Sequence, residues 1–236
     1  MATGLIVTPL SAVAAASHKT TTTTAPKGTT TTTTPLSKAD TWLKKALQAE
    51  IGVGSVHIDG SVKQGKKTIT FHLVVNGDGD GGGTFVQQGN TVNLLRVGPL
   101  LYFKAPLSFW AKNASAQQAQ AYGGKWIELS SLDVRFQSFD QFLSAADLVA
   151  AVFQGHPKPL TVGRPTTFNG HSVVIVKEVA RTNGKTSKGY MYIGASGKPW
   201  VYRILNDTPG EISNLVFSHY GKALAITVPP DAINLT

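Results

Sequence analysis

Short runs in which apolar and polar residues alternate occupy much of the chain after residue 50. In residues 67–75, positions 69, 71, 73 and 75 are apolar and face one way. The positions between them, such as His72, face the other way, which is the period of a half-buried strand. Residues 84–87 and 91–97 are two further β-rich runs, joined by a three-residue connection that contains Gly89. Such a connection is typical of a β-hairpin.

The same patterns predict two β-meanders. The first comprises strands at residues 51–60, 67–75, 84–87, 91–97 and 100–104 and a strand ending on Trp126; the second comprises strands at 166–169, 171–179, 188–193, 199–206 and 212–220. Pairs such as Asn169-Gly170 and Ser196-Gly197 separate the strands of the second meander, because asparagine, serine and glycine favour turns. The tail at residues 223–228, followed by two prolines, is expected to close the domain.

Helical spacing of apolar residues predicts three helical segments. Residues 37–50 carry an apolar stripe, and Ser37 or Asp40 can cap this helix. A second segment bears Phe109 and Trp110, and a third, at residues 138–153, repeats apolar residues at three- and four-residue steps. Helices and meanders together predict an α+β domain in which one long, twisted antiparallel sheet has helices gathered on one face.

The first 36 residues do not have the composition of a folded domain. Residues 1–16 are apolar and end in Ala14-Ala15-Ala16, which predicts a signal peptide cleaved after Ala16. No lysine or arginine precedes the apolar run and Pro9 interrupts it, so a truncated leader or a disordered tail are the alternatives. The run is shorter than the roughly 20 residues of a membrane-spanning helix. Residues 17–36 are a threonine-rich segment that we expect to be a disordered linker.

A signal peptide followed by a threonine-rich tether indicates an exported protein, with residues 37–236 as its folded domain. The formal net charge of +9 makes an anionic membrane surface or a nucleic acid worth considering as a partner. The basic residues are spread along the chain without a nucleic-acid-binding motif, so we expect no nucleic acid. The sequence has no cysteine, which excludes disulfides, thiol catalysis and cysteine-based zinc sites.

No catalytic or metal-binding motif is present. The six histidines show no HxH or HExxH spacing, and the chain has no GxSxG elbow and no phosphate-binding loop. Asp78 and Asp80 resemble part of a calcium loop, but the downstream acidic ligand is missing, so residues 76–83 are predicted to be a plain loop. We therefore expect no enzyme, no cofactor and no metal. A hydrolase assembled from distant residues remains an alternative, which a polar cleft with a histidine–carboxylate pair would favour.

Aromatic and aliphatic side chains on the predicted strands and helices have two interpretations. The simpler one, on composition alone, is an ordinary filled core. The other is that part of this surface lines a cavity for an acyl chain or another hydrophobic ligand.

Three stretches of the sequence resemble a known family. GTFVQQGNTVNLLRVGPLLYFKAPLSFW, the following YGGKWIEL and the later GYMYIGASGKPWVYRIL are similar to actinobacterial exported lipoproteins of the LppX/LprG type and their LolA-like relatives. The shared pattern is a strand with Tyr102, a helix with Trp110, the Gly124-Lys125-Trp126 strand and the hairpin from Tyr192 to Pro199.

This resemblance implies a strongly curved half-barrel sheet with helices packed on its concave face. It also implies a hydrophobic cavity that carries lipids or lipoproteins in the cell envelope, and no catalytic residues. The chain lacks the lipobox cysteine of those lipoproteins. We therefore expect no lipid anchor, a location in the cell envelope or outside the cell, and a monomer.

The resulting hypothesis is an exported, non-enzymatic binder or carrier of a lipid or other hydrophobic ligand. The alternative is a structural or interaction domain of the envelope, with a filled core and no ligand. The residues predicted to line the cavity are Phe71, Leu73, Phe85, Leu94, Tyr102, Trp110, Phe142, Val149, Phe153, Tyr192 and Tyr202.

Overall fold

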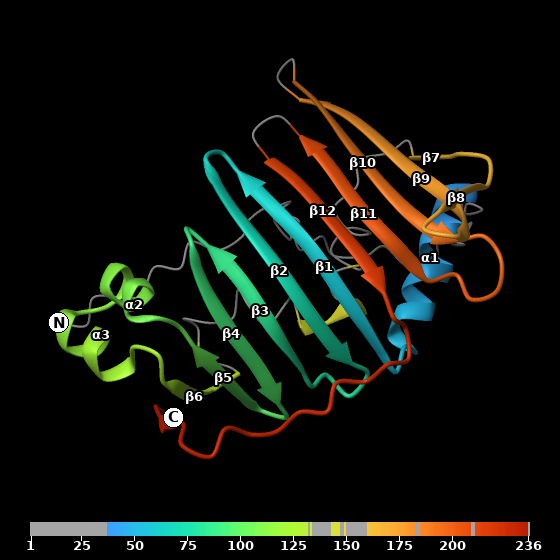
Figure 1. The fold of residues 1–236 in the computed structure, drawn as a ribbon. Coiled ribbons are helices and arrows are strands. Elements are labelled where there is room, and N and C mark those ends of the chain that lie inside the picture. The colour runs from blue at the N-terminus through green and yellow to red at the C-terminus, as the bar shows by residue number, and fades with distance from the viewer. Residues whose placement is uncertain are drawn as a thin grey trace, which may run out of the picture.

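One large sheet, antiparallel except where its short edge strand pairs in parallel, makes up most of the protein (Figure 1). The computed structural model describes residues 37–131, 133, 143–146, 149, 160–182, 185–208 and 211–235. The helices are α1 (Lys38–Ile51), α2 (Leu107–Asn113) and α3 (Ala116–Tyr122). The strands are β1 (Ser55–Gln64), β2 (Lys67–Asn76), β3 (Gly81–Gln87), β4 (Asn90–Val97), β5 (Leu100–Lys104), β6 (Trp126–Ser130), β7 (Leu160–Val162), β8 (Thr166–Phe168), β9 (His171–Thr182), β10 (Lys185–Gly194), β11 (Val201–Thr208), β12 (Glu211–Ser218) and β13 (Ile233–Asn234).

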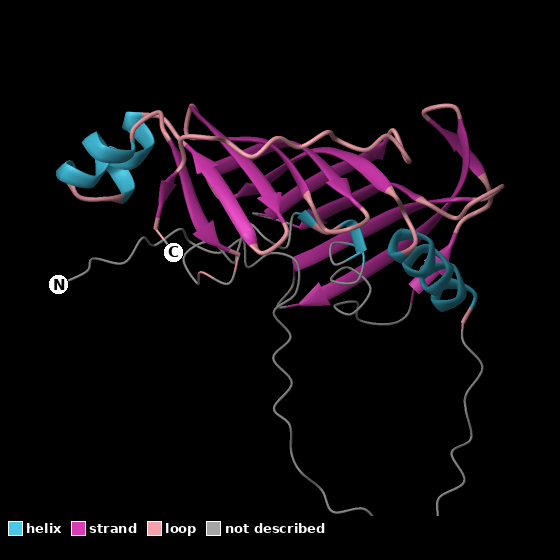
Figure 2. Cartoon of the chain, turned by 90° about the horizontal axis from the view of Figure 1, so that it is seen from below, coloured by secondary structure: helices cyan, strands magenta, loops and turns pink. Residues whose placement is uncertain are grey.

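The sheet consists of two meanders joined edge to edge. Its order is β13-β6-β5-β4-β3-β2-β1-β12-β11-β10-β9-β7, with β8 paired to β9. The join is the antiparallel pairing of β1 with β12, which runs from His57 opposite Ser218 to Gln64 opposite Glu211. The sheet is curved and stays open, because β13 and β7 do not meet (Figures 1 and 2). The predicted α+β class with a curved antiparallel sheet is confirmed.

Helix α1 packs on the sheet near β7 and β9. It begins where predicted, because the Ser37 side chain accepts a hydrogen bond from the Asp40 backbone N–H. Leu43 and Ala46 are buried in one apolar cluster that also contains the residues facing α1 from the sheet. Val149, the last described residue of the predicted helix at 138–153, is buried in the same cluster. Helix α1 and the described residues 143–146 and 149 therefore pack on the same face (Figure 2).

The two short helices lie at the other end of the sheet from α1 (Figure 1). Helix α2 directs Phe109 and Trp110 onto Phe103 of β5, with ring centroids 5.6 Å apart in both cases. Helix α3 begins with a capping box in which Ser115 and Gln118 satisfy each other's backbone N–H groups. None of the described helices is long and apolar enough to cross a membrane.

Strand β3 begins inside the segment predicted to be a loop. Gly81 to Gly83 pair with β2, and Gly83 adopts a φ of 148° opposite Leu73. A Cβ on Gly83 would lie 2.0 Å from the His72 carbonyl oxygen, so only glycine fits this register. The two aspartates in the preceding turn have structural roles. Asp78 Oδ1 accepts the Asp80 backbone N–H at 3.0 Å, and the Asp80 carboxylate accepts the Gly98 N–H at 2.6 Å and so links two neighbouring turns.

Two other boundaries differ from the prediction. Helix α1 continues to Ile51, so β1 starts at Ser55, and the strand predicted to end on Trp126 begins there. The tail runs along the ends of the strands, where the Asn76 side chain donates to the Leu224 carbonyl oxygen at 3.1 Å and accepts its N–H at 3.0 Å. The amide of Asn76 thus takes the place of a strand partner for the tail.

Candidate functional site

An unbroken row of apolar side chains crosses the sheet on the face that α1 covers. Its cross-strand partners, from β4 through β3, β2, β1, β12, β11, β10 and β9 to β7, are Val92, Phe85, Phe71, Gly60, Leu215, Ile204, Met191, Val176 and Val162. Every side chain in this apolar row belongs to the buried cluster or packs against it. At roughly 4.8 Å between neighbouring strands, the row extends for roughly 40 Å.

A second, parallel row widens the same surface. It runs through Ile127, Phe103, Leu94, Gly83, Leu73, Ile58 and Phe217. We call the two rows together the inner face. At Gly60, an added Cβ would lie 2.6 Å from the Asn214 carbonyl oxygen and 2.8 Å from Leu215 Cδ2. Glycine therefore lets β1 and β12 pack closely where the two meanders join.

Aromatic rings close the inner face at the α2 end. The Phe85 and Phe103 rings lie 6.1 Å apart, and Trp110 is edge-on to Phe109 at 5.7 Å and to Tyr122 at 5.4 Å. The indole N–H of Trp110 is buried and has no hydrogen-bond acceptor within the described part of the chain. This end of the face is therefore apolar but carries one unsatisfied donor.

A buried carboxyl group marks the opposite end. Glu50, on the sheet-facing side of α1, is 2% exposed. Its Oε1 accepts the Val201 N–H at 2.9 Å and lies 2.8 Å from the Tyr220 hydroxyl, while Oε2 has no partner among the described residues. Tyr220 also donates to the Val201 carbonyl oxygen. These contacts join the end of α1 to the start of β11 and the end of β12.

The protonation of Glu50 follows from this environment. Burial raises the pKa of Glu50 from 4.5 to about 7, against the opposing effect of the hydrogen bonds from Val201 and Tyr220. When Glu50 is neutral, Oε1 can still accept from Val201 and Tyr220, because Oε2, which has no partner among the described residues, can carry the proton. The pKa of Tyr220 is raised well above 10, first by burial and then by the nearby Glu50.

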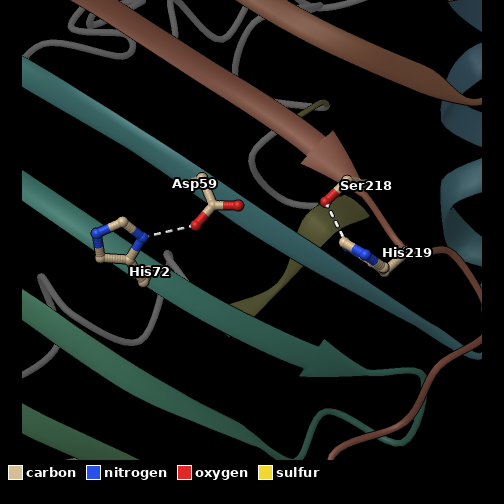
Figure 3. Close-up of polar contacts among 4 residues, drawn as sticks. All are labelled: Asp59, His72, Ser218 and His219. Atoms are coloured by element: carbon tan, nitrogen blue, oxygen red, sulfur yellow. Dashed lines mark hydrogen bonds and ion pairs between the residues drawn. The ribbon is translucent and has the colours of Figure 1, made fainter. Parts of the chain in front are cut away.

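The other face of the sheet carries separate polar pairs (Figure 3). His72 Nδ1 lies 2.6 Å from Asp59 Oδ1, and the two side chains are 64% and 52% exposed. Ser218 contacts His219 at 2.9 Å, and Asp59 is not part of that pair. These contacts do not form a serine–histidine–aspartate triad, and the histidine–carboxylate pair lies on an open strand surface. No group of three or more metal-ligating side chains gathers among the residues that the structure describes.

The structure brings several of the predicted lining residues together. Phe71, Leu73, Phe85 and Leu94 lie on the inner face and are buried. Trp110 packs at its α2 end, and Val149 is buried in the same cluster. Phe142 and Phe153 lie outside the described residues.

Three predicted tyrosines lie elsewhere. Strand alternation places Tyr102 on the other face, paired with Glu128, and burial together with Glu128 raises its pKa. Tyr192 is also on that face, where its ring lies 5.5 Å from the Arg203 guanidinium. Tyr202 sits at a β-bulge and stacks on His171 at 4.1 Å. A lining built from the inner face therefore omits these three side chains.

Sequence reasoning missed the residues at the α1 end of the face. Glu50 and Tyr220 meet although 170 positions separate them, and Val201 is 151 positions from Glu50. The inner-face residues of β11 and β10, such as Ile204 and Met191, were also missed. In β11 the buried positions Val201 and Ile204 are three apart, because the β-bulge opposite Tyr192 and Ile193 interrupts the alternation, so the local pattern did not identify Ile204.

Comparisons with known proteins support the fold. No protein-family model matches the sequence, and no curated protein matches it. LppX, a lipoprotein of Mycobacterium tuberculosis, has a similar structure with a TM-score of 0.54 and 14% identity, over 80% of this chain and 98% of LppX. LprF from Mycobacterium bovis is similar with a TM-score of 0.52 and 14% identity, over 81% of this chain and 97% of LprF. The chain therefore has the fold of LppX and LprF, which confirms the fold that the sequence motifs predicted.

Proposed function

We propose that this protein is an exported, non-enzymatic binder or carrier of a lipid or another hydrophobic ligand. The ligand lies between the inner face and the segment that contains Val149. The observation that carries the proposal is the apolar row, which crosses the sheet from β4 to β7 without a polar side chain. The similar fold of LppX, a lipoprotein, supports a place in the cell envelope.

The inner face suits a long alkyl chain for a physical reason. Burying a methylene contributes about 0.8 kcal/mol, so a chain of about sixteen carbons has roughly 13 kcal/mol of apolar transfer to gain. Losses of freedom on binding offset part of this gain. The Trp110 indole N–H at one end is a donor that an ester or acid carbonyl of the ligand can satisfy.

One observation favours the alternative of a filled core. Leu143, Ala145 and Val149 already bury their side chains in the same cluster as the inner face. If the rest of this interior is equally well packed, the domain is a structural or interaction module of the envelope without a ligand.

A pair of matched tryptophan substitutions tests the proposal. Leu73 points into the inner face opposite Gly83, and its neighbour Val74 points to the other face opposite Gly82. We expect Leu73→Trp to lower the uptake of a fluorescent long-chain fatty acid at least tenfold, because the indole occupies ligand space beside a residue without a side chain. Val74→Trp should leave uptake unchanged.

The fold of both variants is followed by circular dichroism and thermal melting. A Leu73→Trp protein that fails to fold would show that this position is filled core, and equal uptake by all three proteins would place the ligand elsewhere. Either result contradicts the proposal.

A further inference from the structure

A groove of about 650 Å³ lies on the solvent side of α1, away from the inner face. The helix contributes Lys44, Lys45 and Gln48 to it, and the turn between β10 and β11 contributes Lys198 and Trp200. The spacing of the helical residues places them on one stripe, opposite the buried stripe of Leu43 and Glu50. None of the described residues that line this α1 groove is acidic.

Among the residues that the structure describes, none neutralises the three lysines of the α1 groove. The two carboxylates of α1 are on its other side, where the Ser37 hydroxyl binds Asp40 at 2.7 Å and Glu50 meets Val201. None of the three ammonium groups forms an ion pair with a described residue. The Lys198 ammonium instead lies 5.2 Å from the Trp200 ring. The groove thus concentrates positive charge beside an aromatic wall.

That aromatic wall is held in place from inside. Trp200 stacks on Tyr220 with ring centroids 4.3 Å apart and an interplanar angle of 7°. Tyr220 is in turn bonded to Glu50 and Val201. The position of the indole is therefore set by a buried network that also fixes the end of α1.

An exposed apolar side chain borders the same surface. Ile51, at the end of α1, is 63% exposed and directly precedes Gly52, which lines the groove. It is seven positions after Lys44 and three after Gln48, so it projects on the same side of the helix. Lysines around a tryptophan and an exposed isoleucine make an amphipathic surface, and such surfaces partition into the headgroup layer of a bilayer.

We propose that the α1 groove binds the phosphate-bearing headgroup of an anionic phospholipid at a bilayer surface, with Ile51 inserted beside it. Charge complementarity between the three lysines and the phosphate sets the headgroup preference. Ile51 favours a bilayer over a free anion as the ligand, because an exposed apolar side chain can insert into a bilayer but does not contribute to binding a small hydrated anion. This proposal does not depend on whether the inner face holds a ligand.

The test is cosedimentation of the full chain with vesicles of phosphatidylcholine, with and without phosphatidylglycerol. We expect binding only to the anionic vesicles. A lysine close to an anionic surface strengthens binding about fivefold, so the double variant Lys44→Gln/Lys198→Gln should bind roughly 25-fold more weakly. The matched control is Lys66→Gln/Lys67→Gln, which removes the same charge at the β1–β2 turn away from α1 (Figure 1).

Two further experiments distinguish binding to a bilayer from binding to a free anion. Ile51→Ser should weaken binding to anionic vesicles without changing the melting temperature, because that side chain is already exposed. Inorganic phosphate at the same phosphorus concentration should not displace the protein from the vesicles.

We expect that only the groove double variant and Ile51→Ser lose binding to the anionic vesicles. An equal loss of vesicle binding in Lys66→Gln/Lys67→Gln would show that the net charge of the protein alone attracts it to the vesicles. Displacement by inorganic phosphate, with no effect of Ile51→Ser, would show a small-anion site. Either outcome, or a failure of the wild type to bind anionic vesicles, overturns the proposal. None of these results changes the proposal that the inner face binds a lipid, because lipid uptake is measured in a separate assay.

Discussion

At the scale of single residues, the burial of Glu50 makes the stability of the protein depend on pH. Its carboxyl group is neutral in the folded protein over a range where it is ionised in the unfolded chain, because burial disfavours the charge. The folded state then holds the proton more tightly than the unfolded state between pH 4.5 and about 7. Stability contributed by this group is present below pH 4.5 and is lost as the pH rises to about 7.

Glu50→Gln should remove this dependence, because an amide mimics the neutral acid and keeps the acceptor for the Val201 N–H. A pKa change from 4.5 to about 7 corresponds to about 3 kcal/mol. The unfolding free energy of Glu50→Gln relative to wild type should therefore rise by about 3 kcal/mol between pH 4 and pH 8 in urea titrations. Glu50→Ala, which leaves the Val201 N–H without its acceptor, should be destabilised at both pH values. A difference between Glu50→Gln and wild type that stays constant with pH would contradict this account of the site.

At the scale of elements, Val149 belongs to the same buried cluster as the inner face. Val149 is 1% exposed, so Val149→Asp buries an unpaired carboxylate or forces it to protonate. We expect a loss of about 4 kcal/mol in unfolding free energy by chemical denaturation. The control is Ala146→Asp, at a partly exposed position of the same segment, which should cost much less. Equal losses for the two variants would show that Val149 has no special place in the core.

The elements themselves were predictable where the signal is local. Alternation in β2, the Gly89 hairpin and the Ser37 cap of α1 each depend on a few neighbouring residues, and the structure confirms them. The start of β3 was missed because glycines usually mark loops, whereas here Gly83 is needed for close strand pairing.

The candidate site was predictable only in part. The alternating residues Phe71 and Leu73 were placed correctly on the inner face. Tyr102 was selected for its aromatic ring, although strand alternation makes it point to the other face of the sheet from its neighbour Phe103. The contact between Glu50 and Tyr220 spans 170 positions and depends on how β1 pairs with β12. No local pattern encodes that pairing.

At the scale of the whole molecule, the pairing of β1 with β12 turns two meanders into one surface. Each meander alone would present only part of the apolar row, and the join at Gly60 makes the row continuous. The same sheet places the α1 groove at one end. At the other end lies the Trp110 indole N–H, which has no acceptor among the described residues. The molecule thus combines an extended apolar face with a cationic groove on the outer side of the helix that covers one end of it.

The central claim is that the inner face holds a hydrophobic ligand. The direct measurement is organic extraction of the full-length protein produced in an actinobacterial host, followed by mass spectrometry of the extract. Leu73→Trp and Val74→Trp are extracted in parallel as the lining variant and its control. The account predicts lipid at about one equivalent per chain in the wild type and in Val74→Trp, and a marked loss in Leu73→Trp. A lipid-free extract from the wild type at high protein load would contradict it and would favour a domain with a filled core.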